Sequence, residues 1–379
     1  MTAADPVREP VRFGTLISAN RHEGQSDADV LARSVAVARK TEELGLDDVW
    51  VTEHHFLPSV VAPSAMSFAS FLLGTTSRVR VGTAVALLPL HSPVHIAEQA
   101  AFMDHVGQGR FVLGVGRGLP VVEYEVIGGG PAHWKDGLGE ALDLTLRAWT
   151  GKVSADSALH RFRPVTVSPT PRTPEGPPVY VAASSPDSVA LAAERGIPML
   201  LYFDKDAAAK ADMIARHTAL ADEHGHRDPA AGDHAFAVYA QVTDTEEQAH
   251  ALMRDRAKRS LRANQDSQII IGDGDGPRQA TPGEDEETVD RMARKMLAEH
   301  PVGTVDTCVE RLVHAITTCG ARRVLCQVEV SGERHGSLRN LERLTTEVFP
   351  EVRRRVGPPP IGPAGPVGPP PVGTPPPAA

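Results

Sequence analysis

This sequence has few cysteines and aromatic residues, and it lacks basic clusters and long apolar runs. Each of these features argues against a class of structure or of binding partner. The three cysteines, Cys308, Cys319 and Cys326, lie near the C-terminus without a metal-type pairing, so we expect reduced core residues rather than disulfides. No uninterrupted segment reaches the roughly 18 apolar residues of a membrane span. Residues 1–10 carry charge and proline where a secretory signal needs an apolar run. We therefore expect a cytoplasmic protein that does not contact membranes.

Charge and composition narrow the function further. The formal net charge is −9 and there is no basic cluster that would track a phosphate backbone, so we expect no nucleic-acid partner. Aromatic residues make up only 4% of the chain, so no aromatic cage indicates a substrate class. With 41% apolar residues among 379, the chain can form one large barrel or two smaller domains.

From about residue 11, short β-branched runs alternate with longer amphipathic runs, which is typical of a parallel β/α protein. Eight strands are predicted, at Val11–Ser18, Asp48–Glu53, Val79–Leu87, Arg110–Gly116, Pro178–Ala183, Met199–Phe203, Ala235–Val242 and Arg323–Val330. Eight helices are predicted, at Asp27–Leu44, Ser64–Thr75, Pro93–Val106, Lys135–Thr150, Pro186–Glu194, Asp206–His224, Thr245–Ala263 and Thr304–Gly320. These numbers favour a (β/α)8 TIM barrel. A Rossmann-type sheet would need a glycine fingerprint after its first strand, and Leu16–His22 has none.

Three segments depart from this alternation. The barrel domain is predicted over residues 11–355, after an N-terminal extension over 1–10. Residues 151–178 are rich in proline, threonine and serine around an alternating stretch, which predicts a hairpin insertion on the barrel rim. Residues 264–287 are acidic and glycine-rich, and too long for a simple connection, so they are predicted to form a lid loop or a disordered span. Residues 356–379 are rich in proline and glycine and predict a disordered tail.

Glu53 ends the second predicted strand, and His54 and His55 follow it. In a parallel β/α barrel, the carboxyl ends of the strands are where ligands bind. A histidine there can exchange protons near neutral pH. We therefore predict that this segment supplies a catalytic histidine that acts as an acid or base, with Glu53 beside it. The alternative is that these residues are only polar residues closing a strand.

Two further strand ends carry groups suited to a phosphorylated ligand. After the fourth strand, Gly116 and Gly118 flank Arg117, so a flat ligand can approach the backbone while the arginine binds phosphate. After the fifth strand, Ser184 and Ser185 precede Pro186 at a helix start, where backbone N–H groups attract anions. A structural ion pair of Arg117 and ordinary N-capping by the serines remain as alternatives.

A metal-dependent barrel hydrolase is the competing interpretation. Adjacent strand residues point to opposite faces, so His54 and His55 are badly placed to bind one ion. His91 and His95 are four residues apart, but Pro93 separates them. We therefore predict no metal site.

Together these motifs resemble the luciferase-like flavin monooxygenases, the group that includes bacterial luciferase. The resemblance runs from about Phe13 to Phe349. Its most specific parts are Glu53–Phe56, Val81–Pro93, Gly109–Phe111 with Gly116–Leu119, and Val181–Pro186 with Gly196–Met199. It implies a TIM barrel that uses reduced FMN and resembles the luciferase α subunit.

The resemblance also implies roles for individual residues. His54 corresponds to the catalytic histidine, Arg117 and Ser184 to phosphate-binding residues, and Glu123 to an acidic residue that tunes flavin chemistry. A non-proline cis peptide of some relatives is expected at Phe68–Ala69. The cofactor-binding set implied is Arg117, Gly116, Gly118, Ser184, Ser185, Ala84, Phe68 and Ala69. Bacterial luciferase has a reactive cysteine where this chain has Gly116, and a glutamate where it has Ala183, so we do not expect light emission as a role.

The function implied is a two-component monooxygenase. A separate NAD(P)H:flavin reductase supplies reduced FMN, O2 adds to the flavin to give a hydroperoxide, and a small hydrophobic substrate such as an aldehyde or a secondary-metabolite ring is oxygenated. A homodimer is expected. Two alternatives stay open: a deazaflavin-dependent oxidoreductase of the same fold, and a non-catalytic flavin-binding partner subunit.

Overall fold

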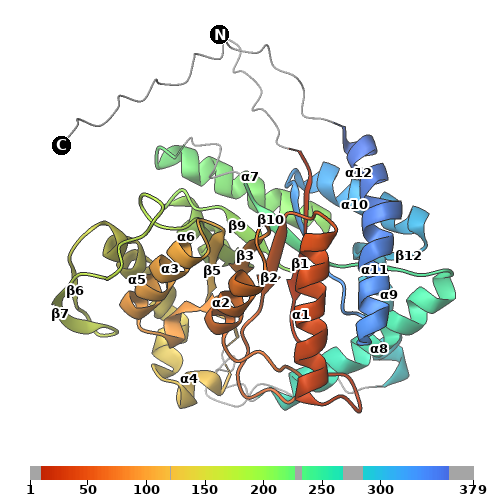
Figure 1. The fold of residues 1–379 in the computed structure, drawn as a ribbon, viewed down its shortest axis with the longest axis horizontal. Coiled ribbons are helices and arrows are strands. Elements are labelled where there is room, and N and C mark those ends of the chain that lie inside the picture. Colours follow the sequence, from red (N-terminus) through yellow and green to blue (C-terminus); the bar gives the residue numbers. More distant parts are fainter. Residues whose placement is uncertain (1–9, 120, 227–232, 268–284, 358–379) are drawn as a thin grey trace, which may run out of the picture.

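Eight parallel strands close into a barrel in this computed structural model, which describes residues 10–119, 121–226, 233–267 and 285–357 (Figure 1). In the order of their pairing, the strands are β1 (Arg12–Ile17), β2 (Asp48–Val51), β3 (Arg80–Thr83), β5 (Phe111–Gly116), β8 (Val179–Ala183), β9 (Met199–Leu201), β10 (Ala235–Tyr239) and β13 (Arg323–Gln327). β13 pairs with β1 and closes the ring. β4 (Ala86–Leu87) continues the line of β3 and pairs with β5. The predicted TIM barrel is confirmed.

Helices follow the strands and surround the barrel (Figure 1). The predicted helices are α1 (Asp27–Glu43), α2 (Ala65–Thr75), α3 (Pro93–Val106), α5 (Gly130–Thr150), α6 (Pro186–Ala193), α7 (Ala207–Glu223), α8 (Glu246–Asp266) and α10 (Val305–Cys319). Many of these helices begin after a polar N-cap residue. In α1 this residue is Ser26, whose side chain accepts the backbone N–H of Asp29. Among the described helices, none is long and apolar enough to cross a membrane.

Several elements were not predicted. They are α4 (Glu123–Val126), α9 (Glu286–Glu299), α11 (Arg334–Arg343), α12 (Phe349–Val356), the short helical turns η1 (Leu88–Leu90) and η3 (Leu344–Val348), and the strand β12 (Val302–Gly303). β12 pairs with β11 (Gln241–Val242), which lies at the end of the predicted strand Ala235–Val242. α11 completes the last β/α unit, because α10 precedes β13 rather than following it.

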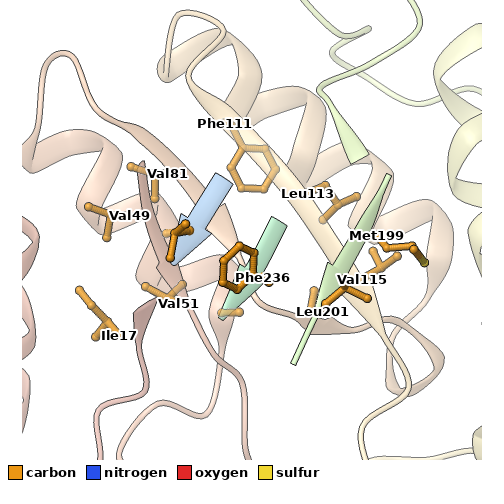
Figure 2. Close-up of a cluster of buried hydrophobic side chains, with 14 of the residues drawn as sticks. Ile17, Val49, Val51, Val81, Phe111, Leu113, Val115, Met199, Leu201 and Phe236 are labelled. Carbon is orange, nitrogen blue, oxygen red and sulfur yellow. The ribbon is translucent and has the colours of Figure 1, made fainter. Parts of the chain in front are cut away.

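Each strand directs alternate side chains to the two sides of the barrel wall. The outward side chains form the main apolar core together with the helices, and Figure 2 shows part of it, with Val49, Phe111 and Phe236 among the labelled residues. Inward side chains such as Trp50 and Tyr180 fill the lumen and meet edge to face. Gly82 makes room for Trp50, because a Cβ at that position would lie 2.6 Å from the indole. The lumen is therefore packed rather than open.

A buried polar cluster closes the end of the barrel where the strands begin. Arg323 at the start of β13 donates hydrogen bonds to Asp48 of β2 and, over 2.8 Å, to Asp233. Tyr180 of β8 donates to the same oxygen of Asp233 over 2.9 Å. Burial lowers the pKa of Arg323, but the two carboxylates outweigh it and keep the guanidinium charged. This floor leaves the opposite end of the barrel for a ligand.

The interruptions of the barrel are described in part. Residues 151–178 contain an antiparallel hairpin of β6 (Val153–Asp156) and β7 (Arg161–Val165), as the predicted rim insertion requires. The predicted loop at 264–287 has helical ends, in α8 and α9, while 268–284 lie outside the described residues. α12 continues to Val356, one residue past the predicted domain end. Residues 1–9 and 358–379 also lie outside the described part of the chain.

Candidate active site

Glu53 is a buried hydrogen-bond hub just after β2. Its Oε2 accepts the N–H of Ala65 over 2.9 Å, and its Oε1 accepts the N–H of Leu87 over 3.1 Å and contacts Nε2 of His91 at 2.8 Å. It thereby ties the end of β2 to the start of α2 and to β4. Burial raises the pKa of the Glu53 carboxyl, but the adjacent imidazoles of His55 and His91 and the N–H of Ala65 overcome this and hold it at about 2. Glu53 is therefore ionised at neutral pH.

The two histidines after Glu53 have different environments. The ring of His55 is directed toward Glu53, with Nε2 3.6 Å from Oε1. The ring of His54 has no hydrogen-bond partner among the described residues, while its backbone N–H donates to the carbonyl of Ala62. Burial lowers the pKa of His54, and the nearby charge of Glu53 opposes this only partly. His54 thus offers a neutral imidazole that can accept a proton.

A second buried carboxyl lies beside these histidines. Glu123, at the start of α4, is 2% exposed, and its Oε2 accepts the backbone N–H of His55 over 3.3 Å. Burial raises the pKa of Glu123 to about 7. Two neighbouring carboxyls with such different pKa values can have different chemical roles. Glu53 stays charged, while Glu123 gains or loses a proton near neutral pH.

Arg117 follows β5, as predicted, and its guanidinium carbon lies 4.4 Å from the centroid of the Trp134 ring. Within the described residues it has no carboxylate partner, which argues against the structural ion pair. Trp134 donates from Nε1 to the carbonyl of Gly118 over 3.1 Å, and Tyr124 donates to the carbonyl of Arg117. These bonds hold the turn that presents the cation to solvent.

Glycine is required at position 116. A Cβ there would lie 2.7 Å from Cγ2 of Val85 and 3.1 Å from the Cβ of Ala182, closer than side chains pack. Gly116 therefore keeps β5 close to Val85, which follows β3, and to Ala182 of β8.

The two serines after β8, Ser184 and Ser185, differ in their hydrogen bonds and exposure. Ser185 is the N-cap of α6 and accepts the N–H of Ser188 over 3.3 Å, which is ordinary capping. The N–H groups of Ser184 and Ser185 both donate to the hydroxyl of Ser188, so they are not free for phosphate. The exposed hydroxyl of Ser184 remains as a donor at the end of β8.

One predicted position is wrong. Phe68 and Ala69 lie inside α2, where a regular helical backbone excludes the expected cis peptide. The non-proline cis bond joins Ala84 and Val85, between β3 and β4. Val79–Leu87 is predicted as one continuous strand, and the break between β3 and β4 falls inside it. Ala84, also predicted in the cofactor set, lies at this break.

The structure groups three potential metal ligands that the sequence did not bring together. One ligand atom each from Glu53, His55 and His91 lies within 4.8 Å of the others. His91 had been compared with His95, which instead contacts Gln99. Both oxygens of Glu53 already accept N–H groups, so the contacts describe a hydrogen-bond network whose spacing would also suit a divalent cation.

The sequence is similar to those of known monooxygenases. A family model described as luciferase-like monooxygenase matches residues 11–323. The alkanal monooxygenase alpha chain of the Kryptophanaron alfredi symbiont is 26% identical over 359 residues, covering 91% of this chain and 99% of that protein. The beta chain from Photorhabdus laumondii is 26% identical, covering 79% and 86% of the two chains.

Solved structures share the fold at lower identity. Monooxygenase RslO1 from Streptomyces bottropensis superimposes with a TM-score of 0.75 at 21% identity, covering 89% of this chain and 99% of that one. The oxygenating constituent of 3,6-diketocamphane monooxygenase from Pseudomonas putida, solved with FMN, gives 0.70 at 17% identity, covering 90% and 99%. An F420-dependent secondary alcohol dehydrogenase gives the same TM-score, identity and coverage.

Proposed function

The chain belongs to the luciferase-like monooxygenase family, and from this premise we propose that it uses reduced FMN and O2 to oxygenate a small hydrophobic substrate, with a separate NAD(P)H:flavin reductase as its partner. The match over residues 11–323 confirms the predicted family and enzyme class. The reduced flavin would supply the electrons that activate O2. The protein's own residues would bind, orient and exchange protons.

The main support for the proposal is that three ionisable side chains with different protonation states lie at the same end of the barrel. Glu53 is ionised, Glu123 has a pKa of about 7, and His54, which follows Glu53 in the chain, has a neutral ring. Arg117 lies after β5, two strands from β2 in the closed barrel, and would hold the phosphate with the hydroxyl of Ser184. His54 would accept or donate the proton at the reacting atom, and Glu53 would fix the segment that carries it.

A hydrophobic substrate is supported by the apolar side chains that follow β2 and β5. Phe56, Leu119 and Val126 are 54%, 59% and 61% exposed. Large apolar side chains so exposed near a ligand-binding end are typical of a binding surface. Oxygenation of an aldehyde or of a secondary-metabolite ring both fit this surface.

A homodimer is supported by a second apolar surface, on the outside of the barrel. Phe71 of α2 is 52% exposed, and Phe102 and Val106 of the adjacent α3 are 52% and 50% exposed. Burying these three side chains against a second copy would remove this apolar area from water.

Two other functions remain as alternatives. The fold shared with an F420-dependent alcohol dehydrogenase favours a deazaflavin-dependent oxidoreductase, which would transfer hydride without O2. The similarity to an alkanal monooxygenase beta chain favours a partner subunit without catalytic activity. The complete Glu53, His54 and Glu123 arrangement argues for a catalytic chain.

One experiment separates the three. The purified chain is incubated with 18O2, a flavin reductase, NAD(P)H, FMN and a metabolite extract, and the products are analysed by mass spectrometry. A parallel reaction contains reduced F420 without FMN. One 18O atom in an organic product supports the monooxygenase, reduction of an organic substrate by reduced F420 alone supports the dehydrogenase, and no product in either reaction supports the partner subunit.

A further inference from the structure

A second polar cluster lies at the barrel mouth, away from Arg117. A small cavity there is lined by residues from the ends of β1, β10 and β13 and from α8, namely Asn20, His22, Tyr239, Arg256, Arg259, Gln327, Glu329 and Val330. In the closed ring, β13 and β1 lie opposite β8 and β5, after which Ser184 and Arg117 are found. This cluster is therefore across the mouth from the proposed phosphate site.

Arg256 is the exceptional residue of the cluster. It projects from α8, with its guanidinium carbon 5.0 Å from the centroid of the Tyr239 ring, and it donates to the Tyr239 hydroxyl and to Ser260, each over 2.8 Å. Its Nε is buried without a hydrogen-bond partner. Among the described residues, none of the carboxylates forms an ion pair with it. Arg256 is thus a positioned cation with unused donors.

The other charges around the cavity do not neutralise Arg256. Glu329 is fully buried and bound to Arg33, whose Nε lies 2.9 Å from Oε1. Arg259 pairs with the largely exposed Asp255 and donates to the carbonyl of Val330 over 3.2 Å. The local charge therefore retains an excess of cations.

The arginines around His22 make the electrostatic potential inside the cluster positive. Burial, followed by the charges of Arg259, Arg33 and Arg256, lowers the pKa of His22 to about 3. His22 is consequently neutral at physiological pH, so it adds no cation of its own. The same positive potential attracts an anion.

The cavity itself has room for about one water molecule. Oε2 of Glu329 and Oε1 of Gln327 are buried and lack partners among the described residues. A water bound there would donate to these two oxygens. A larger ligand would then meet the arginines from the mouth side, without contacting the Glu329 carboxylate directly.

We propose that Arg256, with Arg259 beside it, binds a carboxylate of the substrate, so that the substrate is an otherwise apolar organic acid. This inference rests on the proposed function and deepens it, because it assigns a substrate class. A carboxylate paired with Arg256 would fix one end of the molecule on the β10 and β13 side. Its apolar part would extend over the mouth toward Phe56 and His54.

Binding of two matched probes tests the inference. Decanoate and decanol have the same chain length and differ in charge, and their affinities for the full-length, flavin-free protein are measured by isothermal titration calorimetry. We expect decanoate to bind roughly tenfold or more tightly than decanol. Arg256→Gln should remove this preference, while Arg256→Lys should keep part of it.

Lys258→Gln is the control, because it removes one positive charge from the same helix at a side chain that pairs with Glu286 outside the cavity. It should leave both affinities unchanged. Thermal unfolding verifies that each variant is folded. Equal binding of the two probes to the wild type, or an unchanged preference in a folded Arg256→Gln variant, would overturn the inference.

The outcome is independent of the proposed function, because no flavin is present in the titration. FMN binding and 18O incorporation by the wild type are measured separately. Loss of oxygenase activity with an intact decanoate preference would remove the proposed function and leave an acid-binding site, and the reverse result would remove only the site.

Discussion

His91 contacts Glu53 through Nε2 and Oε1 at 2.8 Å, and this contact joins the turn after β4 to the end of β2. The carboxylate that accepts it is also bound by two backbone N–H groups, from Ala65 and Leu87. Three segments that are remote in sequence therefore depend on one ionised side chain next to His54.

Glu53→Gln should lower the free energy of unfolding by about 3 kcal/mol at pH 7, because an amide cannot accept at both positions and a charged buried network is broken. The pKa of Glu53 is depressed to about 2 from 4.5, so its contribution is present above pH 4.5 and is lost as the pH falls toward 2. Chemical denaturation across this range should show that the free energies of unfolding of the wild type and of Glu53→Gln converge as the pH falls. Glu43→Gln, at a side chain 67% exposed, is the control.

Glu123→Gln should have the opposite pH dependence. Its pKa is raised from 4.5 to about 7, so the folded protein loses stability as the pH rises between these values, by up to about 3 kcal/mol. Glutamine cannot ionise, so thermal unfolding should show that the stability of the variant relative to the wild type increases from pH 5 to pH 8. The control Glu125→Gln, at an exposed neighbouring side chain, should show no such increase. Parallel curves for wild type and Glu123→Gln would show that Glu123 does not titrate in this range.

His54→Ala should keep binding of reduced FMN and lower oxygenation by roughly 10²–10⁴-fold, with O2 released as hydrogen peroxide. In the proposed function His54 supplies proton transfer, while the phosphate would be bound by residues after β5 and β8. Product yield and peroxide are measured together. His55→Ala should affect stability more than turnover, because its ring faces Glu53. Equal product yield at matched flavin loading would exclude His54 from the chemistry.

Arg117→Ala should weaken binding of reduced FMN by about 2 kcal/mol, the scale of a charge-assisted hydrogen bond. Anaerobic fluorescence titration measures the dissociation constant. Arg161→Ala, at a side chain 80% exposed on the rim hairpin, should leave it unchanged. An unaltered constant in a folded Arg117→Ala variant would place the phosphate elsewhere.

Phe102→Glu should convert a dimer to a monomer, because it introduces a charge into the apolar surface on α2 and α3. Sedimentation velocity measures the mass in solution. Val165→Glu, on β7 and 41% exposed, is the matched control. A wild type that sediments as a monomer, or a Phe102→Glu variant that stays dimeric, would remove this surface as the interface.

The barrel could be predicted from the sequence because its strands and helices differ in hydrophobic period. Pro93–Val106 was predicted with the bounds that α3 has, since Ser92 and Pro93 mark its start and Gly107 follows its end. The helices after β13 were missed. α11 and α12 are strongly polar, and only tertiary packing identifies their apolar residues, such as Leu341 and Phe349, as core.

The site was predictable only where residues adjoin in sequence. Glu53 and His54 stand together at a strand end, and Arg117 stands among glycines, so local pattern was enough to identify them as candidates. The contact of Glu123 with the backbone of His55, and that of His91 with Glu53, join residues 68 and 38 positions apart. No local pattern encodes such contacts. The Arg256 cluster was missed for the same reason, because its members come from four separate elements.

The polar floor of the barrel has a consequence for synthesis of the chain. Arg323 opens the last strand to be made, and it is the residue that contacts Asp48 and Asp233, while β13 itself lies between β1 and β10. A ribosome must therefore translate more than three hundred residues before the ring can close. Until then Asp48 lacks its cation and the edges of β1 and β10 stay unpaired, so the nascent protein is most exposed to misassembly in the interval just before β13 emerges.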